Sequence, residues 1–239
     1  MKILAIDTSS AVASAAILED GKLIAEYILN NKKTHSQKIM PMIDEIIKDS
    51  DLTINDIDVF AAAYGPGSFT GLRIGVATAK ALAHAVNKPL VEVSTLEGIA
   101  YNAVYSDLLL CPIMDARRNQ VYNAVYKSEG DYLCEVTAPR AIALDDCSGE
   151  LLEQKEKVLF MGDGVAVHRE RIVELMGEQA VFAAAPFLNQ RASSVAQIAY
   201  NKAQKGETVT YLEFAPFYLR KSQAEREREE KLKKEKESC

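Results

Sequence analysis

Hydrophobic residues near the start of the chain fall into short runs separated by polar turns. Residues 2–10, 13–21 and 22–29 have the composition of strands, and Glu19-Asp20-Gly21 is typical of a hairpin turn between the last two. The period then changes, because apolar side chains between 39 and 47 recur with the spacing of a helix. We therefore predict a strand meander followed by an amphipathic helix over residues 35–49.

The remaining pattern alternates strands and helices and then starts again. In the first half we predict a strand at 58–65, a helix at 70–86, a strand at 89–94 and a helix at 95–105. In the second half we predict a three-strand meander over 108–138, a helix near 145–154, a strand at 157–164, a helix at 165–176, a strand at 180–185 and a helix at 193–205.

The two halves resemble each other at an offset of roughly 108 residues, the distance between Asp7 and Asp115. With one extra residue at the turn, Glu26 falls on Glu135. A chance match between two ordinary meanders is the alternative. The pattern predicts two α/β lobes with mixed sheets, which we place at residues 1–106 and 107–219. Residues 220–239 are so rich in charge that we expect a solvated helix or a frayed tail.

Composition narrows the class of protein. The formal net charge of −6 argues against a chain that grips nucleic acid by itself. We see no signal peptide and no run of eighteen apolar residues, so we expect a cytoplasmic protein with no membrane contact. The four cysteines lack the spacing of a zinc site and are expected to be reduced thiols.

A glycine-rich stretch, Ala63 to Leu82, invites a phosphate-binding interpretation. Its glycines do not have the spacing of a Walker loop, and the sixth place of a GxGxxG fingerprint is Thr70. The simpler interpretation is a tight turn from strand to helix, in which Gly71 and Gly75 let another segment pack closely on the helix. The helix N-terminus could still attract an anion.

The same stretch, "GPGSFTGLRIGVATAKALAHAVNKPLVEVSTLEGIA", with "HSQKIMPMI" before it and "PFYLR" near the end, resembles the bacterial TsaB family. That resemblance covers residues 1 to about 221. It implies the actin-like/Hsp70-like ATPase fold, in which two α/β lobes are related by duplication, and it therefore favours the internal repeat over a chance match. It also implies a role in making threonylcarbamoyladenosine in tRNA.

The resemblance also implies that catalytic chemistry is absent here. TsaB is a paralogue of the catalytic subunit TsaD, whose two metal-binding histidines correspond to Thr95 and Ile99 in this chain. The hairpin turns that hold phosphate in actin-like ATPases contain no glycine here, although Asp7 and Asp115 remain. The segment 162–165 (GDGV) is either a strand-end turn or a relic of an adenosine loop. We expect no catalytic, cofactor-binding or metal-binding residue.

An interaction surface is then the main candidate for function. The apolar arc of the helix over 35–49 is about 160° wide, more than one core-facing stripe needs, although deeper burial in its own lobe would also explain it. The resemblance implies that this helix and the next pair with a TsaD-like subunit. The expected contacts are Met40, Ile43, Ile47, Arg73, Val76 and Lys80.

We therefore expect a non-catalytic scaffold subunit of the tRNA-modifying complex, which reaches tRNA only through that complex. A TsaE-like ATPase is a further candidate partner, and a homodimer of the free chain is left open. The first alternative is a nucleotide-binding actin-like enzyme that works alone. The second is a protease, for which His35 beside Ser36 offers no third member.

Overall fold

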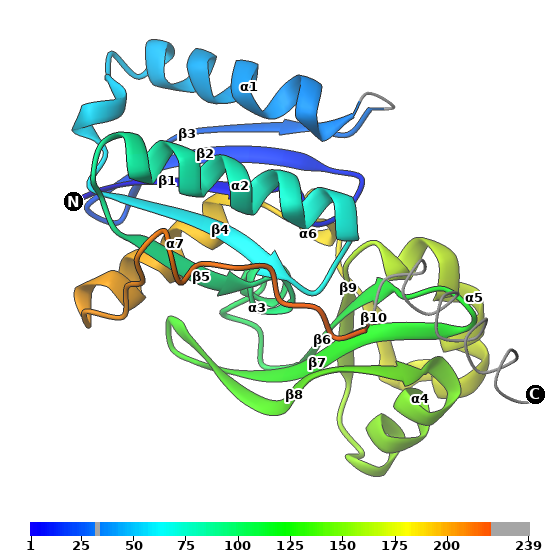
Figure 1. Cartoon of the computed structure of the whole chain (residues 1–239). Coiled ribbons are helices and arrows are strands. Elements are labelled where there is room, and N and C mark those ends of the chain that lie inside the picture. The colour runs from blue at the N-terminus through cyan, green and yellow to red at the C-terminus, as the bar shows by residue number, and fades with distance from the viewer. Residues whose placement is uncertain (32–33, 221–239) are drawn as a thin grey trace, which may run out of the picture.

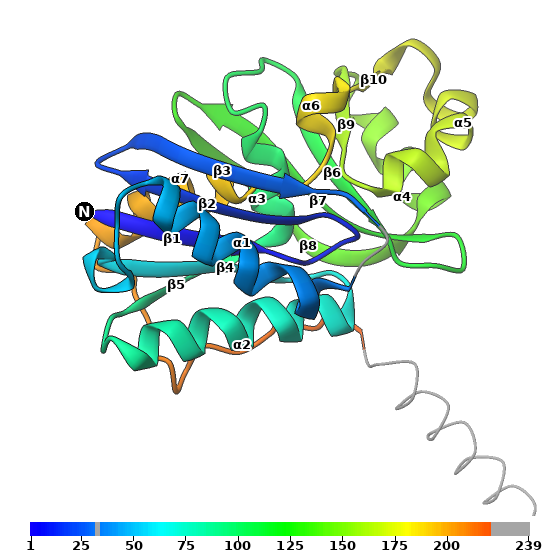
Figure 2. The same ribbon diagram turned by 90° about the horizontal axis from the view of Figure 1, so that it is seen from above.

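The computed structural model describes residues 1–31 and 34–220, which form two lobes, each built on a five-stranded mixed sheet (Figures 1 and 2). The strands are β1 (Lys2–Asp7), β2 (Ala13–Glu19), β3 (Lys22–Leu29), β4 (Val59–Gly65), β5 (Leu90–Ser94), β6 (Leu109–Asp115), β7 (Gln120–Glu129), β8 (Tyr132–Ala143), β9 (Val158–Met161) and β10 (Ala180–Phe182). The helices are α1 (His35–Asp49), α2 (Phe69–Ala85), α3 (Thr95–Tyr101), α4 (Leu144–Glu153), α5 (Gly164–Met176), α6 (Ala185–Leu188) and α7 (Ala192–Gln204), with short 3-10 turns at Ile54–Asp56 and Gly177–Gln179.

The two sheets have the same topology, so the internal repeat is confirmed. The strand order is β3-β2-β1-β4-β5 in the first lobe and β8-β7-β6-β9-β10 in the second. The central strand of each sheet, β1 or β6, runs antiparallel to the following strand and parallel to the fourth strand of its lobe. Asp7 and Asp115 each end that central strand, as the repeat predicts.

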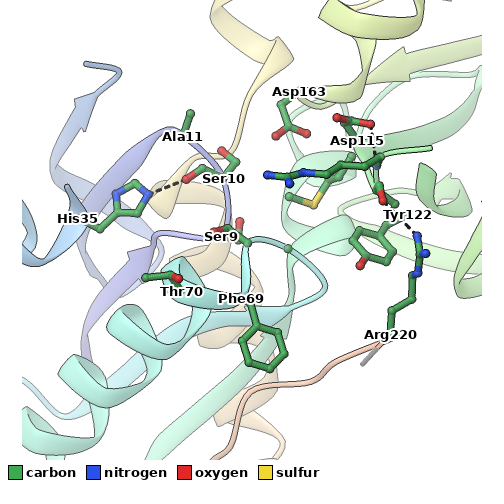
Figure 3. A pocket seen from close by; sticks show the side chains of 15 residues that line it. Ser9, Ser10, Ala11, His35, Phe69, Thr70, Asp115, Tyr122, Asp163 and Arg220 are labelled. Carbon is green, nitrogen blue, oxygen red and sulfur yellow. Dashed lines mark hydrogen bonds between the residues drawn. The ribbon is translucent and has the colours of Figure 1, made fainter. Parts of the chain in front are cut away.

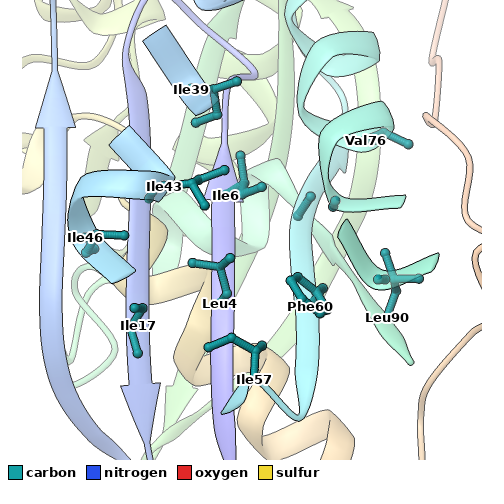
Figure 4. Packing of buried hydrophobic residues seen from close by; sticks show 14 of the residues in the cluster. Leu4, Ile6, Ile17, Ile39, Ile43, Ile46, Ile57, Phe60, Val76 and Leu90 are labelled. Carbon is teal, nitrogen blue, oxygen red and sulfur yellow. The ribbon is translucent and has the colours of Figure 1, made fainter. Parts of the chain in front are cut away.

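Helices α1 and α2 form one layer over the first sheet. The helix predicted over 35–49 has those bounds, and Ile39, Ile43 and Ile46 on its inner face are buried against Leu4 and Ile17 of the sheet (Figure 4). Serine and threonine hydroxyls commonly cap helix N-termini, and the Ser68 hydroxyl accepts a hydrogen bond from the Gly71 N–H at the start of α2. Local pattern and capping therefore explain this layer.

The other face of each sheet is covered by a helix that belongs, by chain order, to the other lobe. Helix α3 follows the first sheet, yet Leu96 and Ile99 pack under the second sheet against Leu110 and Met114. Helix α7 follows the second sheet, yet its apolar face packs under the first; the buried residues of that face are Ala192, Val195, Ala196, Ile198 and Ala199. In Figure 1, α7 lies on the side of the first sheet opposite α1 and α2.

This exchange corrects the lobe boundary that we placed at residue 107. The second lobe does not extend to 219, because α7 and the segment after it belong to the first lobe. That segment, residues 208–220, is named the C-terminal strap here. Val209 pairs with Leu90 at the edge of the first sheet, and Phe214 is fully buried in the first-lobe core. The predicted charged tail lies outside the described residues, apart from Arg220.

None of the helices in the two described ranges is both long and apolar enough to cross a lipid bilayer.

Two of the six expected partner contacts are buried in the core of their own lobe. Ile43 is 2% exposed and Val76 is 3% exposed, and both belong to the cluster beneath α1 and α2. The expectation that their side chains face a partner is therefore wrong in this structure. The wide apolar arc of α1 is explained by its depth in the lobe, because the helix lies over β2 and also contacts α2 and β3.

We expect Ile43→Ala to lower the free energy of unfolding by about 2–5 kcal/mol, because it leaves a cavity in a packed core. Met40→Ala, on the exposed face of the same helix, should change it by less than about 1 kcal/mol. Urea unfolding of both variants followed by circular dichroism measures the difference. Equal effects of the two substitutions would contradict the burial of Ile43.

Candidate functional site: the cleft between the lobes

A cavity of about 670 Å³ lies between the two lobes, where the central strands of the two sheets end (Figure 3). Its walls come from the turn after β1, the loop before α2, the turn after β6 and the start of α5. The lining residues are Ser9, Ser10, Ala11, His35, Gly67, Ser68, Phe69, Thr70, Met114, Asp115, Ala116, Arg117, Tyr122, Asp163 and Arg220. Ligands of α/β proteins commonly bind at the carboxyl ends of strands, so this cleft is the first candidate site.

The turn after β1 uses its polar groups within the chain. The Asp7 carboxylate accepts hydrogen bonds from the Ser9 N–H at 2.8 Å and from the Ser9 hydroxyl at 2.6 Å. The Ser10 hydroxyl donates to Gln190 Oε1 at 2.7 Å and accepts from the Val12 N–H at 3.2 Å. These groups are therefore already engaged and do not converge on the cavity.

The glycine-rich stretch packs against that turn. A β-carbon at Gly67 would lie 2.5 Å from the Ser9 carbonyl oxygen, and one at Gly71 or Gly75 would come even closer to atoms of Thr8. The Ser68 N–H donates to the Ser9 carbonyl at 2.7 Å, and the Thr8 hydroxyl donates to the Gly71 carbonyl at 2.8 Å. The expected close packing on Gly71 and Gly75 is confirmed, and the segment that approaches is the chain's own first turn.

The turn after β6 holds an unusual backbone. Arg117, Arg118 and Asn119 have φ values of 62°, 55° and 56°, a region that glycine adopts without steric cost and other residues rarely adopt. The turn is closed by the Arg117 N–H, which donates to Asp115 at 2.9 Å. Arg220 of the C-terminal strap reaches this turn and donates to the Ala116 carbonyl at 3.1 Å. The turn thus keeps a glycine-like conformation but carries large side chains.

Asp115 and Asp163 line the cleft, and Asp7 is buried beside the wall residue Ser9. Burial raises the pKa of Asp7 to about 6, against the opposing hydrogen bonds from Ser9. Burial also raises the pKa of Asp163 to about 6, and the charge of Asp115 adds to the shift. His168 Nε2 lies 3.5 Å from Asp115 Oδ1. Arg117 and Arg220 also line the cleft, so acidic side chains do not outnumber basic ones in its walls.

The segment 162–165 forms the turn between β9 and α5. A β-carbon at Gly162 would overlap the Ile113 carbonyl of the neighbouring strand, and Gly162 has a φ of 98°. The glycine is therefore explained by close packing on β6, as a strand-end turn requires.

The serines of the cleft do not form a hydrolase triad with His35. Its Nε2 lies 2.6 Å from the backbone carbonyl of Ser10, and the Ser10 hydroxyl points to Gln190 instead. The Ser9 hydroxyl donates to Asp7. A triad needs a serine hydroxyl bonded to the imidazole, and the described residues of the cleft have no such pair.

The four other expected partner contacts lie on or near the surface of α1 and α2. Met40 is 47% exposed and Ile47 is half-buried at the edge of the core. The Arg73 Nε donates to the Tyr218 hydroxyl at 3.1 Å, and Lys80 donates to the Phe214 carbonyl at 2.8 Å. Arg73 and Lys80 are therefore both hydrogen-bonded to the C-terminal strap of the same chain.

The positions that correspond to metal-binding histidines of TsaD lie in the interior. Thr95 and Ile99 are both fully buried, and Ile99 belongs to the core beneath the second sheet. Neither a threonine hydroxyl in this place nor an isoleucine is a suitable ligand for a transition metal. Within residues 1–31 and 34–220, no group of three histidine, cysteine, aspartate or glutamate side chains could hold a metal ion.

Sequence reasoning identified Asp7 and Asp115 but missed several residues that complete the cleft. Asp163 carried a signal, since it lies in the segment 162–165 (GDGV) at the end of a predicted strand. Arg220 ends the PFYLR segment that carries the family resemblance, but its contact with the turn after β6 could not be predicted from it. Gln190 carried no signal, because it reaches the cleft from a distant part of the chain.

We expect the two raised pKa values to make stability fall as the pH rises from about 4 to about 6. Each carboxyl holds its proton more strongly in the folded chain than in the unfolded chain, whose pKa is near 3.8. Asp163→Asn should therefore stabilise the protein at pH 7.5 by about 1–3 kcal/mol and lose this advantage near pH 4.

Thermal unfolding followed by circular dichroism across this pH range tests the effect. Asp131→Asn in the exposed β7–β8 turn is the matched control and should shift the midpoint little at either pH. A stabilisation by Asp163→Asn that is the same at every pH would contradict the assignment.

Comparison with known proteins identifies relatives along nearly the whole chain. The family model described as TsaD, tRNA N6-adenosine threonylcarbamoyltransferase, matches residues 22–228. A Bacillus subtilis protein named tRNA threonylcarbamoyladenosine biosynthesis protein TsaB is 37% identical, and the match covers 94% of this chain and 96% of that protein. The Escherichia coli protein of the same name is 30% identical with the same coverage of both chains.

Two solved structures show the same fold. One is a Pseudomonas aeruginosa protein described as uncharacterized with similarity to peptidase YEAZ; its TM-score is 0.78 at 24% identity, covering 92% of this chain and 99% of that one. The other is a ROK hexokinase from Thermus thermophilus, with a TM-score of 0.51 at 10% identity, covering 86% of this chain and 100% of that one. The actin-like two-lobed fold expected from the sequence is thereby confirmed.

Proposed function

This chain belongs to the TsaB family of tRNA threonylcarbamoyladenosine biosynthesis proteins, and on that basis we propose that it is the non-catalytic subunit that supports a TsaD-like threonylcarbamoyltransferase. In this proposal the chain reaches tRNA through the complex, and a TsaE-like ATPase is a further partner. The observation that carries the proposal is the chemistry of the cleft. Its first turn is bonded internally, and its second turn is closed on Asp115 and carries large side chains where a phosphate-binding turn needs glycine.

The proposal assigns no metal to the chain. The side chains at the two positions that would hold it, Thr95 and Ile99, do not fit a metal ion, and both are enclosed by the core. No catalytic step is therefore assigned to this subunit, and its contribution is to bind and support the partner.

The alternative is an actin-like protein that binds nucleotide by itself. We expect calorimetric titration of the isolated chain with Mg-ATP to show no saturable binding at micromolar concentration, because the Ser9 and Arg117 N–H groups of the two turns are already bonded to Asp7 and Asp115. Micromolar one-to-one binding would favour the alternative. The protease alternative gains no support from the geometry of His35 and the cleft serines.

The outer face of α1 and α2 suits association with the proposed TsaD-like subunit. Met40 is an exposed apolar side chain on α1, and the exposed residues of α2 include the small side chains Ala77 and Ala81, one turn apart. Small residues let a second helix approach closely, and an exposed methionine adapts to a partner surface. Arg73 precedes Ala77 by one turn on this face.

We expect Met40→Glu to abolish co-purification with the TsaD-like subunit from the same organism. Burying an unpaired carboxylate at an interface costs at least a few kcal/mol, which lowers affinity about a hundredfold or more. The matched control is Val173→Glu on α5, because Val173 is also 47% exposed but lies on the other lobe.

Both variants should melt close to the unmodified chain, and only Met40→Glu should lose binding and threonylcarbamoyladenosine formation in a reconstituted reaction. If the free chain forms a homodimer through the same face, its melting midpoint depends on concentration, so melting is measured at several concentrations. Unchanged affinity of Met40→Glu for the partner would remove this face from the interface.

A further inference from the structure

Two carboxylates occupy matching places in the two lobes. Glu26 on β3 stands opposite Ala16, and Glu135 on β8 stands opposite Tyr126. In each lobe the opposing residue lies three positions before its strand ends. Directly opposed residues of an antiparallel pair extend to the same face of the sheet. Glu26 is therefore on the face covered by α7, and Glu135 is on the face covered by α3.

In the first lobe the chain itself supplies a guanidinium to this carboxylate. Arg191, the N-cap residue of α7, donates to Glu26 from Nε at 3.1 Å and also from Nη2. Ser193 donates to the other carboxylate oxygen from its N–H at 2.9 Å and from its hydroxyl at 2.7 Å. The Glu26 side chain is 6% exposed, so the pair is largely shielded from water.

In the second lobe, none of the described residues places a guanidinium at the corresponding position. The N-cap residue of α3 is Ser94, and a cavity of about 410 Å³ lies where its first turn faces Glu135. The residues that line this cavity, named the α3 cavity here, are Tyr64, Ser94, Glu97, Tyr126, Leu133, Glu135, Ala138, Pro139, Lys202 and Phe217. Among the described residues, no hydrogen bond or ion pair joins the Glu135 carboxylate to another group.

The walls of the α3 cavity suit a flat cation. Tyr64 and Phe217 stand with their ring centroids 5.7 Å apart. Lys202 pairs with Glu97 at 3.0 Å, so Glu97 is already neutralised and Glu135 remains as the unpaired acid. Burial raises the pKa of Tyr126, and the charges of Glu97 and then Glu135 raise it further, which indicates a negative potential at this phenol.

We propose that the α3 cavity binds a guanidinium group, paired with Glu135 and placed against the aromatic walls. Guanidinium matches a carboxylate with two parallel hydrogen bonds and stacks on aromatic rings, whereas an ammonium does neither as well. The first lobe holds the same group in the same place with its own Arg191. The source is either an arginine side chain of a protein or a small guanidinium compound.

Titration of the full chain, followed by NMR of the tyrosine ring signals, tests the proposal. The probes are N-acetyl-arginine amide, which represents a protein side chain, agmatine, which represents a small molecule, and N-acetyl-lysine amide as the ammonium control. Glu135→Gln should weaken guanidinium binding about tenfold or more, and Glu129→Gln in the exposed hairpin should leave it unchanged. Ser94→Arg, which copies the first lobe, should abolish binding by filling the cavity from within.

A stronger response to the arginine amide assigns the site to a protein side chain, and a stronger response to agmatine assigns it to a small molecule. The proposal is overturned if neither guanidinium saturates at millimolar concentration, if the lysine amide binds as tightly, or if Glu135→Gln binds like the unmodified chain. Because Glu135 is exposed and lies outside both cores, its variant keeps the test valid even if Ser94→Arg fails to fold.

Discussion

The architecture depends on the burial of two sheets that are apolar on both faces. A mixed sheet with both faces apolar needs a helical layer on each side, and in each lobe the chain supplies only one such layer locally. The second layer comes by exchange, α3 for the second sheet and α7 for the first. Neither lobe is complete without a helix from the other half of the sequence, and the contact of α3 with α7 joins the two exchanged elements at the centre of the molecule.

The cleft lies between the two lobes that this exchange joins, at the ends of both central strands. The N–H groups of its two turns are not free. Where a phosphate needs free N–H groups, the Ser9 N–H is bound to Asp7 and the Arg117 N–H is bound to Asp115. A cavity of this size therefore does not by itself imply a phosphate ligand, and the outer helices become the more informative surface.

Much of the fold could be predicted from the sequence because its signals are local. The bounds of α1 were predicted, and those of α2 agree within a residue, because periodicity and the turn residues are encoded next to each other. The duplicated topology was visible through Asp7 and Asp115. The identity of the segment that covers an apolar surface cannot be predicted from the residues next to that surface in the sequence. The pattern around Ile43 was the same whether a partner or the chain's own sheet faced it, and nothing near Ala192 indicated that α7 belongs under the first lobe.

The exchange of helices also matters while the chain is being synthesised. The first sheet is complete at Ser94, but the helix that covers its second face begins at Ala192, roughly a hundred residues later. At the usual rate of synthesis, 5–20 residues per second, α7 is synthesised on the order of 10 s after the apolar sheet face that it covers. During that interval the nascent first lobe exposes an apolar sheet face, the kind of surface that makes partly folded chains prone to aggregation.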